Sequence, residues 1–327
     1  MDPRRLDRRQ LLWFAVVCVA LTWVPWAVLG ALGTDIEHGA GLVVFGLAAS
    51  GPSLAALVLW LRYRRTRRGA PVRFSWSGSL LAVVLGAAPS VLAAYCLHAG
   101  DPSVLWQHTT VVVAGAGGPL GALAYTMLSG PLSEEFGWRG YVQPRLRRHL
   151  DPVRTSLLLG IVWGAWHVPL FLLPGTGQHA IGLLSVPGAL FFVMLPPLSY
   201  VALFVSERLR GGVLAAVLLH AAWNFADAAM PALGVTGNVI RTGCVVVAAG
   251  AAAFLWRRGA PVAAPADSSS THGTVGAAPV AETVQPHREP ETVPPHREPE
   301  TVPSHRGTSW DGADSPSPSR TEAQSGQ

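Results

Sequence analysis

Apolar residues form long runs along most of this chain, and polar residues collect between the runs. A helix that spans a bilayer needs about 20 consecutive apolar residues. Eight stretches approach that length and predict an all-α, polytopic membrane protein of about eight transmembrane helices. The sixth stretch is long and contains Pro196 and Pro197, which favour a kink or a break. The predicted spans are residues 11–32, 40–61, 79–98, 109–133, 155–174, 180–206, 211–230 and 238–256.

The arginines predict the orientation of these spans. Arginine clusters precede the first span and follow the second, fourth, sixth and eighth, whereas the intervening loops at 34–38 and 178–179 carry none. Because cytoplasmic loops carry an excess of Lys and Arg, this alternation predicts that both termini are cytoplasmic. The first span is long for the apolar segment of a signal peptide, and no small-residue cleavage site clearly follows it. It is therefore interpreted as an anchor.

Composition supports a membrane protein and excludes some function classes. Half of the residues are hydrophobic and only 13% are charged, against about a quarter in soluble domains, which nearly rules out a water-soluble globular enzyme. The net charge is +5, but the basic residues alternate with the apolar spans. They therefore predict the orientation of the spans in the membrane, and no nucleic-acid partner is expected. Every basic residue is Arg in a chain rich in Ala, Gly, Val and Leu, which is typical of a high-GC bacterial genome. We therefore expect a multi-pass protein of a bacterial cell membrane.

These patterns divide the chain into four regions. Residues 1–108 hold the first three predicted spans, residues 109–232 form a membrane core that contains the polar motifs, and residues 233–258 form the last span. Residues 259–327 are rich in Pro, Ser, Thr, Glu, Arg and His and contain a repeat of period nine. Few large apolar residues occur there, so a disordered tail is predicted. A solvated low-complexity segment is favoured over a metal-binding or partner-binding tract of histidines.

Ionisable residues occur at the cytoplasmic end of the fourth predicted span, although such residues cost about 2.5–3.5 kcal/mol each inside a membrane. Glu135 and Arg139 are four residues apart, so they can pair on one face of a helix. Glu134 points about 100° away and is free for acid–base chemistry. The alternative interpretation is an interfacial salt bridge that caps the span.

Two further polar groups lie near the middle of later spans. His167 is in the fifth span, and His220 and Asn224 share one face of the seventh. Two imidazoles and a carboxylate can hold Zn²⁺ with an open position for water. Alternatively, Glu134 activates water directly, one histidine assists, and His220 with Asn224 donates to the oxyanion. Hydrogen bonding that only joins helices is the non-catalytic alternative.

The polar motifs occur in the same order as in a known family. They are Glu134-Glu135-x-x-x-Arg139, Trp163-x-x-x-His167 and His220-x-x-x-Asn224. The set resembles the EExxxR, FxxxH and HxxxN/B motifs of the CAAX-processing and bacteriocin-processing (CPBP, or Abi) intramembrane proteases, which include the type II CAAX prenyl endopeptidases. The resemblance covers about residues 110–230. Trp163 departs from the motif, which has Phe there, so we expect an altered pocket shape and retained chemistry.

The resemblance implies an endopeptidase with a cytoplasm-accessible site inside the membrane, acting on a membrane-associated or CAAX-like protein or peptide. If the residue roles of the family apply to the matching positions, Glu134 activates water and His167 is its partner. His220 and Asn224 ligate a metal or stabilise the oxyanion, and the ion pair of the first motif supports them.

Two mechanisms stay open from the sequence. In one, zinc is held by Glu134, His167, His220 and Asn224, and the protein is a metalloprotease. In the other, the glutamate acts without metal. Two non-catalytic alternatives are a membrane immunity or scaffold factor and, ranked below it, a transporter, for which the chain shows no clear internal repeat.

Overall fold

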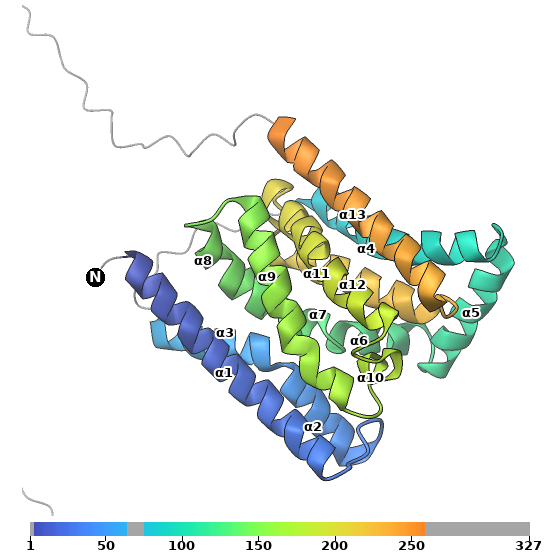
Figure 1. The fold of residues 1–327 in the computed structure, drawn as a ribbon, viewed down its shortest axis with the longest axis horizontal. Coiled ribbons are helices and arrows are strands. Elements are labelled where there is room, and N and C mark those ends of the chain that lie inside the picture. Colours follow the sequence, from blue (N-terminus) through green and yellow to red (C-terminus); the bar gives the residue numbers. More distant parts are fainter. Residues whose placement is uncertain (1–2, 64–74, 259–327) are drawn as a thin grey trace, which may run out of the picture. The chain divides into compact units, whose positions relative to one another are not determined.

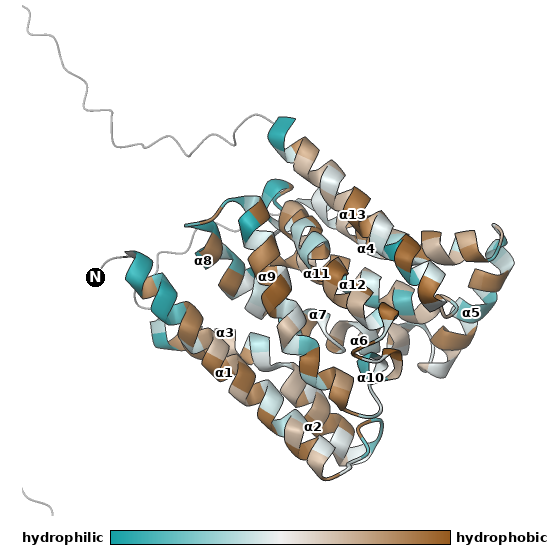
Figure 2. Ribbon diagram, viewed as in Figure 1, coloured by the Kyte–Doolittle hydropathy of each residue, from teal (hydrophilic) through white to brown (hydrophobic). Residues whose placement is uncertain are grey.

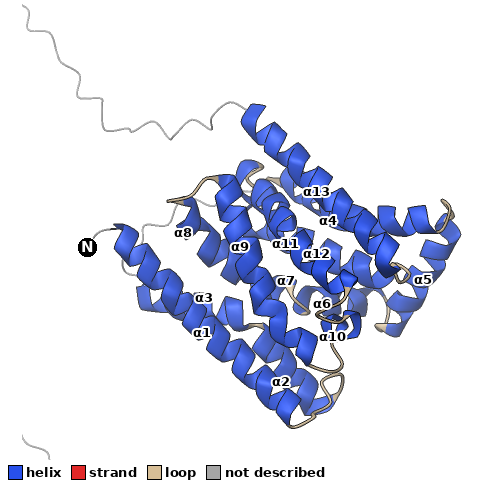
Figure 3. Cartoon of the chain, in the orientation of Figure 1, coloured by secondary structure: helices blue, strands red, loops and turns tan. Residues whose placement is uncertain are grey.

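The computed structural model describes residues 3–63 and 75–258. Within these ranges the chain forms helices joined by short turns, and no strand occurs there (Figures 1 and 3). The predicted all-α fold is therefore confirmed. The predicted disordered tail at 259–327, with its nine-residue repeat, lies outside the described residues.

Six helical segments of the described residues are long and apolar enough to cross a membrane. They correspond to the first, third, fifth, sixth, seventh and eighth predicted spans. They are α1 (Pro3–Ala31), α4 (Trp76–Leu97), α9 (Pro152–His167) with the 3-10 turn η3 (Val168–Leu172), α11 (Val186–Leu203) with the π turn η4 (Phe204–Arg208), α12 (Gly212–Ala229) and α13 (Gly234–Arg258).

The helix α11 continues through Pro196 and Pro197, so the break that these prolines favoured does not occur. A neighbouring helix explains the difference. At Gly160 of α9, the missing side chain leaves room for the backbone of Pro196, and α9 and α11 pack along each other (Figure 1). Close packing of this kind supports a proline-containing membrane helix where backbone hydrogen bonds are lost.

The other two predicted spans are bent. Helix α2 (Gly39–Ala49) meets α3 (Gly51–Tyr63) at 52°. Helix α5 (Pro102–Gly115) meets the helical segment that follows it at 82°. The predicted span over residues 109–133 therefore contains a sharp bend. The bend lies at Gly117 and Gly118, whose φ angles of 81° and 90° favour glycine.

Four short elements follow this bend. They are α6 (Pro119–Leu128), α7 (Pro131–Gly137), the π turn η2 (Trp138–Val142) and α8 (Gln143–Arg147). Gly130 separates α6 from α7 with a φ of 152°. One more short helix, α10 (Gly177–Ile181), lies between η3 and α11. The π turn carries Arg139, and π turns inside helices are frequent at functional sites.

Helix α7 is held closely against the bent α2–α3 span. The Ser50 hydroxyl, at the bend, donates to the hydroxyl of Ser133 at 3.2 Å. At the other end of α7, Gly137 lies directly against Pro52. The bend in this span therefore positions the helix that carries Glu134 and Glu135.

We expect Gly137→Ala to destabilise the protein by about 1–3 kcal/mol, as overpacking of a tight contact does. The added methyl carbon would lie 2.5–2.6 Å from three atoms of Pro52. Gly140→Ala is a matched control three residues along the chain, because the nearest atom to its methyl carbon is in Val213 at 3.6 Å. Thermal unfolding in detergent measures both variants, and equal unfolding temperatures would contradict the expected clash.

Charged side chains join four segments at one end of the helices. Arg148 in the turn after α8 pairs with Asp7 of α1. Arg147 of α8 donates to Glu207 of η4 at 2.8–3.1 Å, and its guanidinium lies 5.9 Å from the ring of Trp256 near the end of α13. Figure 2 shows hydrophilic residues at the start of α1 and at the end of α13. Four of the arginine-rich segments predicted for one side of the membrane thus meet around α8.

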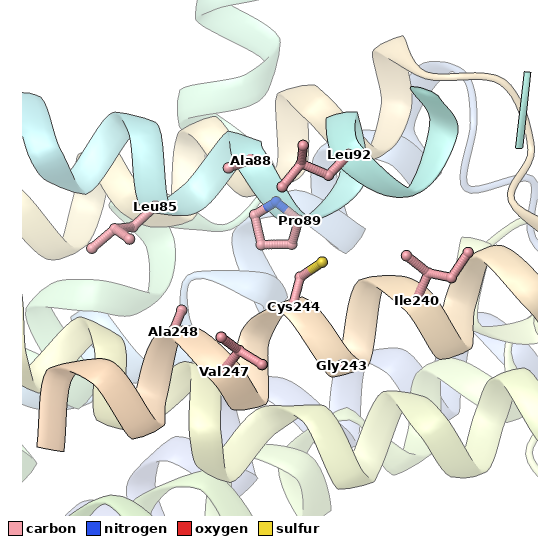
Figure 4. A pocket seen from close by; sticks show the side chains of 9 residues that line it. All are labelled: Leu85, Ala88, Pro89, Leu92, Ile240, Gly243, Cys244, Val247 and Ala248. Carbon is pink, nitrogen blue, oxygen red and sulfur yellow. The ribbon is translucent and has the colours of Figure 1, made fainter. Parts of the chain in front are cut away.

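An apolar groove of about 420 Å³ lies between α4 and α13 (Figure 4). These helices carry none of the motif residues. The groove is lined mainly by Leu85, Pro89, Leu92, Ile240, Cys244 and Val247.

Candidate catalytic site

The motif residues lie on three parts of the chain that meet inside the protein. The first motif is on α7 and η2, the second ends α9, and the third is on α12. All of the charged and imidazole side chains are buried, and Asn224 is half-buried. Direct hydrogen bonds join the first motif to the third and to Trp163 of the second.

Glu135 is the carboxylate that joins two motifs. Its Oε1 accepts a hydrogen bond from Arg139 at 3.0 Å and another from Nδ1 of His220 at 2.8 Å. The pairing of Glu135 with Arg139 follows the predicted spacing, whereas the bond to His220 was not predicted. Because an ionised carboxylate only accepts, His220 carries a proton on Nδ1. In the neutral imidazole, Nε2 then keeps its lone pair.

Glu134 presents its two oxygens to different neighbours. Oε2 accepts a hydrogen bond from the indole Nε1 of Trp163 at 2.6 Å. Gly130 has no side chain, and three polar atoms lie beside its Cα. They are Oε1 of Glu134, Nδ2 of Asn224 and Nε2 of His220. A β-carbon on this glycine would lie 3.1–3.2 Å from each of these three atoms. A carboxylate, an amide and an imidazole therefore converge on one small region.

His167 lies in an aromatic surround at the end of α9. Its Nδ1 contacts the backbone carbonyl of Trp163 at 2.8 Å, so this nitrogen carries a proton and donates. The ring centroids of Trp166 and Phe191 lie 4.8 Å and 5.2 Å from that of His167. The indole of Trp163 contacts both imidazoles, at 5.8 Å from His167 and 5.4 Å from His220. Trp163 thus links His167 to the other motif residues.

The sequence gives little indication that two residues, Trp163 and Gly130, belong to this site. In the sequence, Trp163 differs from the aromatic residue of the motif, and nothing in its spacing reveals a bond to Glu134. Gly130 belongs to none of the three motifs. The Gly130-Pro131 dipeptide is a common mark of a helix boundary, and this signal could have located the break before α7.

The donors do not form a three-ligand metal site in this arrangement. Over residues 3–63 and 75–258, no three His, Cys, Asp or Glu side chains are grouped so that they could hold a metal ion. Glu134, His220 and the side-chain amide of Asn224 face a common region. His167 instead contacts aromatic rings and the backbone carbonyl of Trp163. Zinc held by Glu134, His167, His220 and Asn224 therefore stays a prediction.

Buried acid–base residues inside a bundle of apolar helices define a multi-pass membrane protein with a polar internal site. A comparison with known families finds a match over this part of the chain. Residues 116–226 match the family model described as type II CAAX prenyl endopeptidase Rce1-like. The match over these residues supports an assignment to the CPBP/CAAX protease family. No curated protein matches the chain.

The family match contains all of the motif residues on which the resemblance rested. It begins at the bend between α5 and α6 and ends within α12. The resemblance stated from the sequence is therefore confirmed at the level of the family. The match supports a peptidase.

We expect Gly130→Ala to lower catalytic activity by about 100-fold, the scale of a misplaced catalytic group. The new methyl group would intrude among Glu134, Asn224 and His220, and the φ of 152° disfavours any side chain there. Initial rates of peptide cleavage measure the effect. Gly250→Ala in α13 is the control, since its methyl group meets no described atom within 4 Å. Wild-type activity in Gly130→Ala would show that this region is not where catalysis occurs.

Proposed function

We propose that the protein is an intramembrane endopeptidase that hydrolyses a peptide bond in a membrane-associated or CAAX-like protein or peptide. The observation that carries this proposal is the convergence of Glu134 Oε1, His220 Nε2 and Asn224 Nδ2 beside Gly130. A carboxylate can take a proton from water, an imidazole lone pair can orient that water, and an amide N–H can stabilise an oxyanion. These are the groups that hydrolysis of an amide requires.

In the proposed reaction, Glu134 Oε1 removes a proton from a water molecule held between it and His220 Nε2. The water oxygen forms a bond to the carbonyl carbon of the substrate, and the carbonyl electron pair moves onto its oxygen. Asn224 Nδ2 donates a hydrogen bond to this oxyanion. The protonated Glu134 then passes its proton to the leaving nitrogen as the carbon–nitrogen bond breaks and the carbonyl re-forms.

Glu135 and Arg139 act through His220. The hydrogen bond from His220 Nδ1 to Glu135 keeps the proton on that nitrogen and leaves Nε2 as the acceptor. Arg139 holds the Glu135 carboxylate in its orientation through its own hydrogen bond. The first motif thus divides its two carboxylates between acid–base chemistry and support.

The proposed topology places both termini and the site entrance on the cytoplasmic side. The start of α1, the region of α8, the end of η4 and the end of α13 contact one another through charged and aromatic side chains. These are the segments rich in arginine, and arginine-rich ends face the cytoplasm. A substrate in the membrane, or attached to its inner surface, would approach from this side.

Peptide hydrolysis in H₂¹⁸O tests the proposed activity. The purified protein in lipid nanodiscs is incubated with a farnesylated CAAX-type peptide, the same peptide without the isoprenoid, and an apolar single-span peptide. We expect mass spectrometry to find cleavage of at least one peptide, with one ¹⁸O in the new carboxyl group. If the folded protein leaves all three peptides intact, the result counts against the peptidase and favours an immunity or scaffold factor.

A further inference from the structure

Trp163 contacts the motif residues through several parts of its structure. Its indole N–H donates to Glu134 Oε2 at 2.6 Å, and its backbone carbonyl accepts from His167 at 2.8 Å. The guanidinium carbon of Arg139 lies 4.4 Å from the ring centroid. The ring also meets the imidazole of His220 edge to face at 5.4 Å. One buried side chain therefore links all three motifs.

The indole N–H determines which oxygen of Glu134 is available. A carboxylate can exchange its two oxygens by rotation about its last side-chain bond. The bond from Trp163 holds Oε2, so that Oε1 is the oxygen beside Gly130. The cation of Arg139 over the ring face withdraws electron density from the indole, which makes the N–H a stronger donor.

We propose that Trp163 is a positioning residue that fixes Glu134 through its indole N–H, with Oε2 held and Oε1 presented to the reaction. This inference rests on the proposed function for its catalytic consequence, whereas the bond itself does not depend on any activity. Phenylalanine, the residue of the family motif at this position, supplies an aromatic ring but no donor. The hydrogen bond is therefore a feature of this chain that the motif does not imply.

The ¹⁵N–¹H resonance of the Trp163 indole tests the bond without a substrate. The full-length protein has 12 tryptophans, and Trp163→Phe identifies the resonance by removing it. We expect it downfield of the other indole resonances and expect Glu134→Ala to move it upfield. Glu134→Gln, which retains a weaker acceptor, moves it less. Glu207→Ala is the control and leaves it in place. An unmoved resonance in Glu134→Ala overturns the proposal.

Kinetics then test the positioning role with an isosteric change. Trp163→benzothienylalanine replaces the indole N–H by sulfur and keeps the shape of the ring. We expect kcat to fall about tenfold or more, the lower end for a hydrogen bond to a charged group, with KM little changed. A retained kcat overturns the positioning role.

The matched control applies the same replacement at Trp138. That indole is also buried beside the first motif, but its Nε1 has no hydrogen-bond partner among residues 3–63 and 75–258. We expect kcat there to stay close to the wild-type value, and an equal loss at both positions would overturn the proposal. If the wild type cleaves no peptide, the proposed function fails, while the indole resonance still decides whether Trp163 fixes Glu134.

Discussion

Glu134→Gln is expected to lower the rate of peptide cleavage by about 10³-fold, within the range for loss of a general acid–base group. Glutamine has nearly the same shape as glutamate, and its amide oxygen can still accept the hydrogen bond from Trp163. It cannot take a proton from water, so the variant removes the base and retains the local packing. Initial rates measured on the same peptide as the wild type give the effect, and thermal unfolding checks the fold.

Glu207→Gln is the matched control for this charge-neutralising change. Glu207 is paired with Arg147 at the partly exposed end of the helices, on an element that carries no motif residue. We expect its cleavage rate to equal that of the wild type. A Glu134→Gln rate within tenfold of the wild type would show that Glu134 is not the base.

Arg139→Met is expected to destabilise the protein by about 3–5 kcal/mol, the usual effect of breaking a buried ion pair. The side chains of Arg139 and Glu135 are each only 1% exposed, so the variant leaves the Glu135 carboxylate buried without its cationic partner. The hydrogen bond from His220 to Glu135 offsets part of this loss. Unfolding temperature in one detergent, compared with the wild type, measures the change.

The double variant Glu135→Leu with Arg139→Met separates stability from activity. We expect it to recover most of the lost stability, because both charges leave the buried site together. It should not recover cleavage, because Nδ1 of His220 loses its acceptor. Arg154→Met is the control. It breaks a pair with Asp151 whose side chains are 77% and 48% exposed, and such pairs contribute about 0–1 kcal/mol. Equal destabilisation by Arg139→Met and Arg154→Met would contradict this account of the pair.

Much of the fold could be predicted because long apolar runs dominate its helices. The spans outside the two bent pairs of helices follow directly from hydropathy, and α4 continues as one helix although Pro89 lies inside it. The segment over residues 109–133 could not be predicted in this way. Its apolar character continues through Gly117 and Gly118, so hydropathy alone does not reveal that the backbone turns there. The bend is a property of backbone dihedral angles rather than of side-chain polarity.

The candidate site was predictable within helices and not between them. Four-residue spacing predicts the contact of Glu135 with Arg139, because it depends only on the geometry of one turn. The sequence placed Glu134 near the end of a span and His220 near the middle of another. The turn at Gly130 starts the short helix α7 beside α12, which brings the first motif to the third. Contacts of this kind depend on helix packing, which no spacing in one sequence encodes.

Peptide cleavage after exhaustive chelation is the most direct test of the glutamate mechanism. Zinc content and cleavage are measured on the same samples of wild type and Glu134→Gln, before and after chelation. The mechanism predicts that the metal-depleted wild type still cleaves its peptide and that Glu134→Gln does not. Stoichiometric zinc whose removal abolishes cleavage, and whose return restores it, would contradict direct activation of water by Glu134 and establish a metalloprotease.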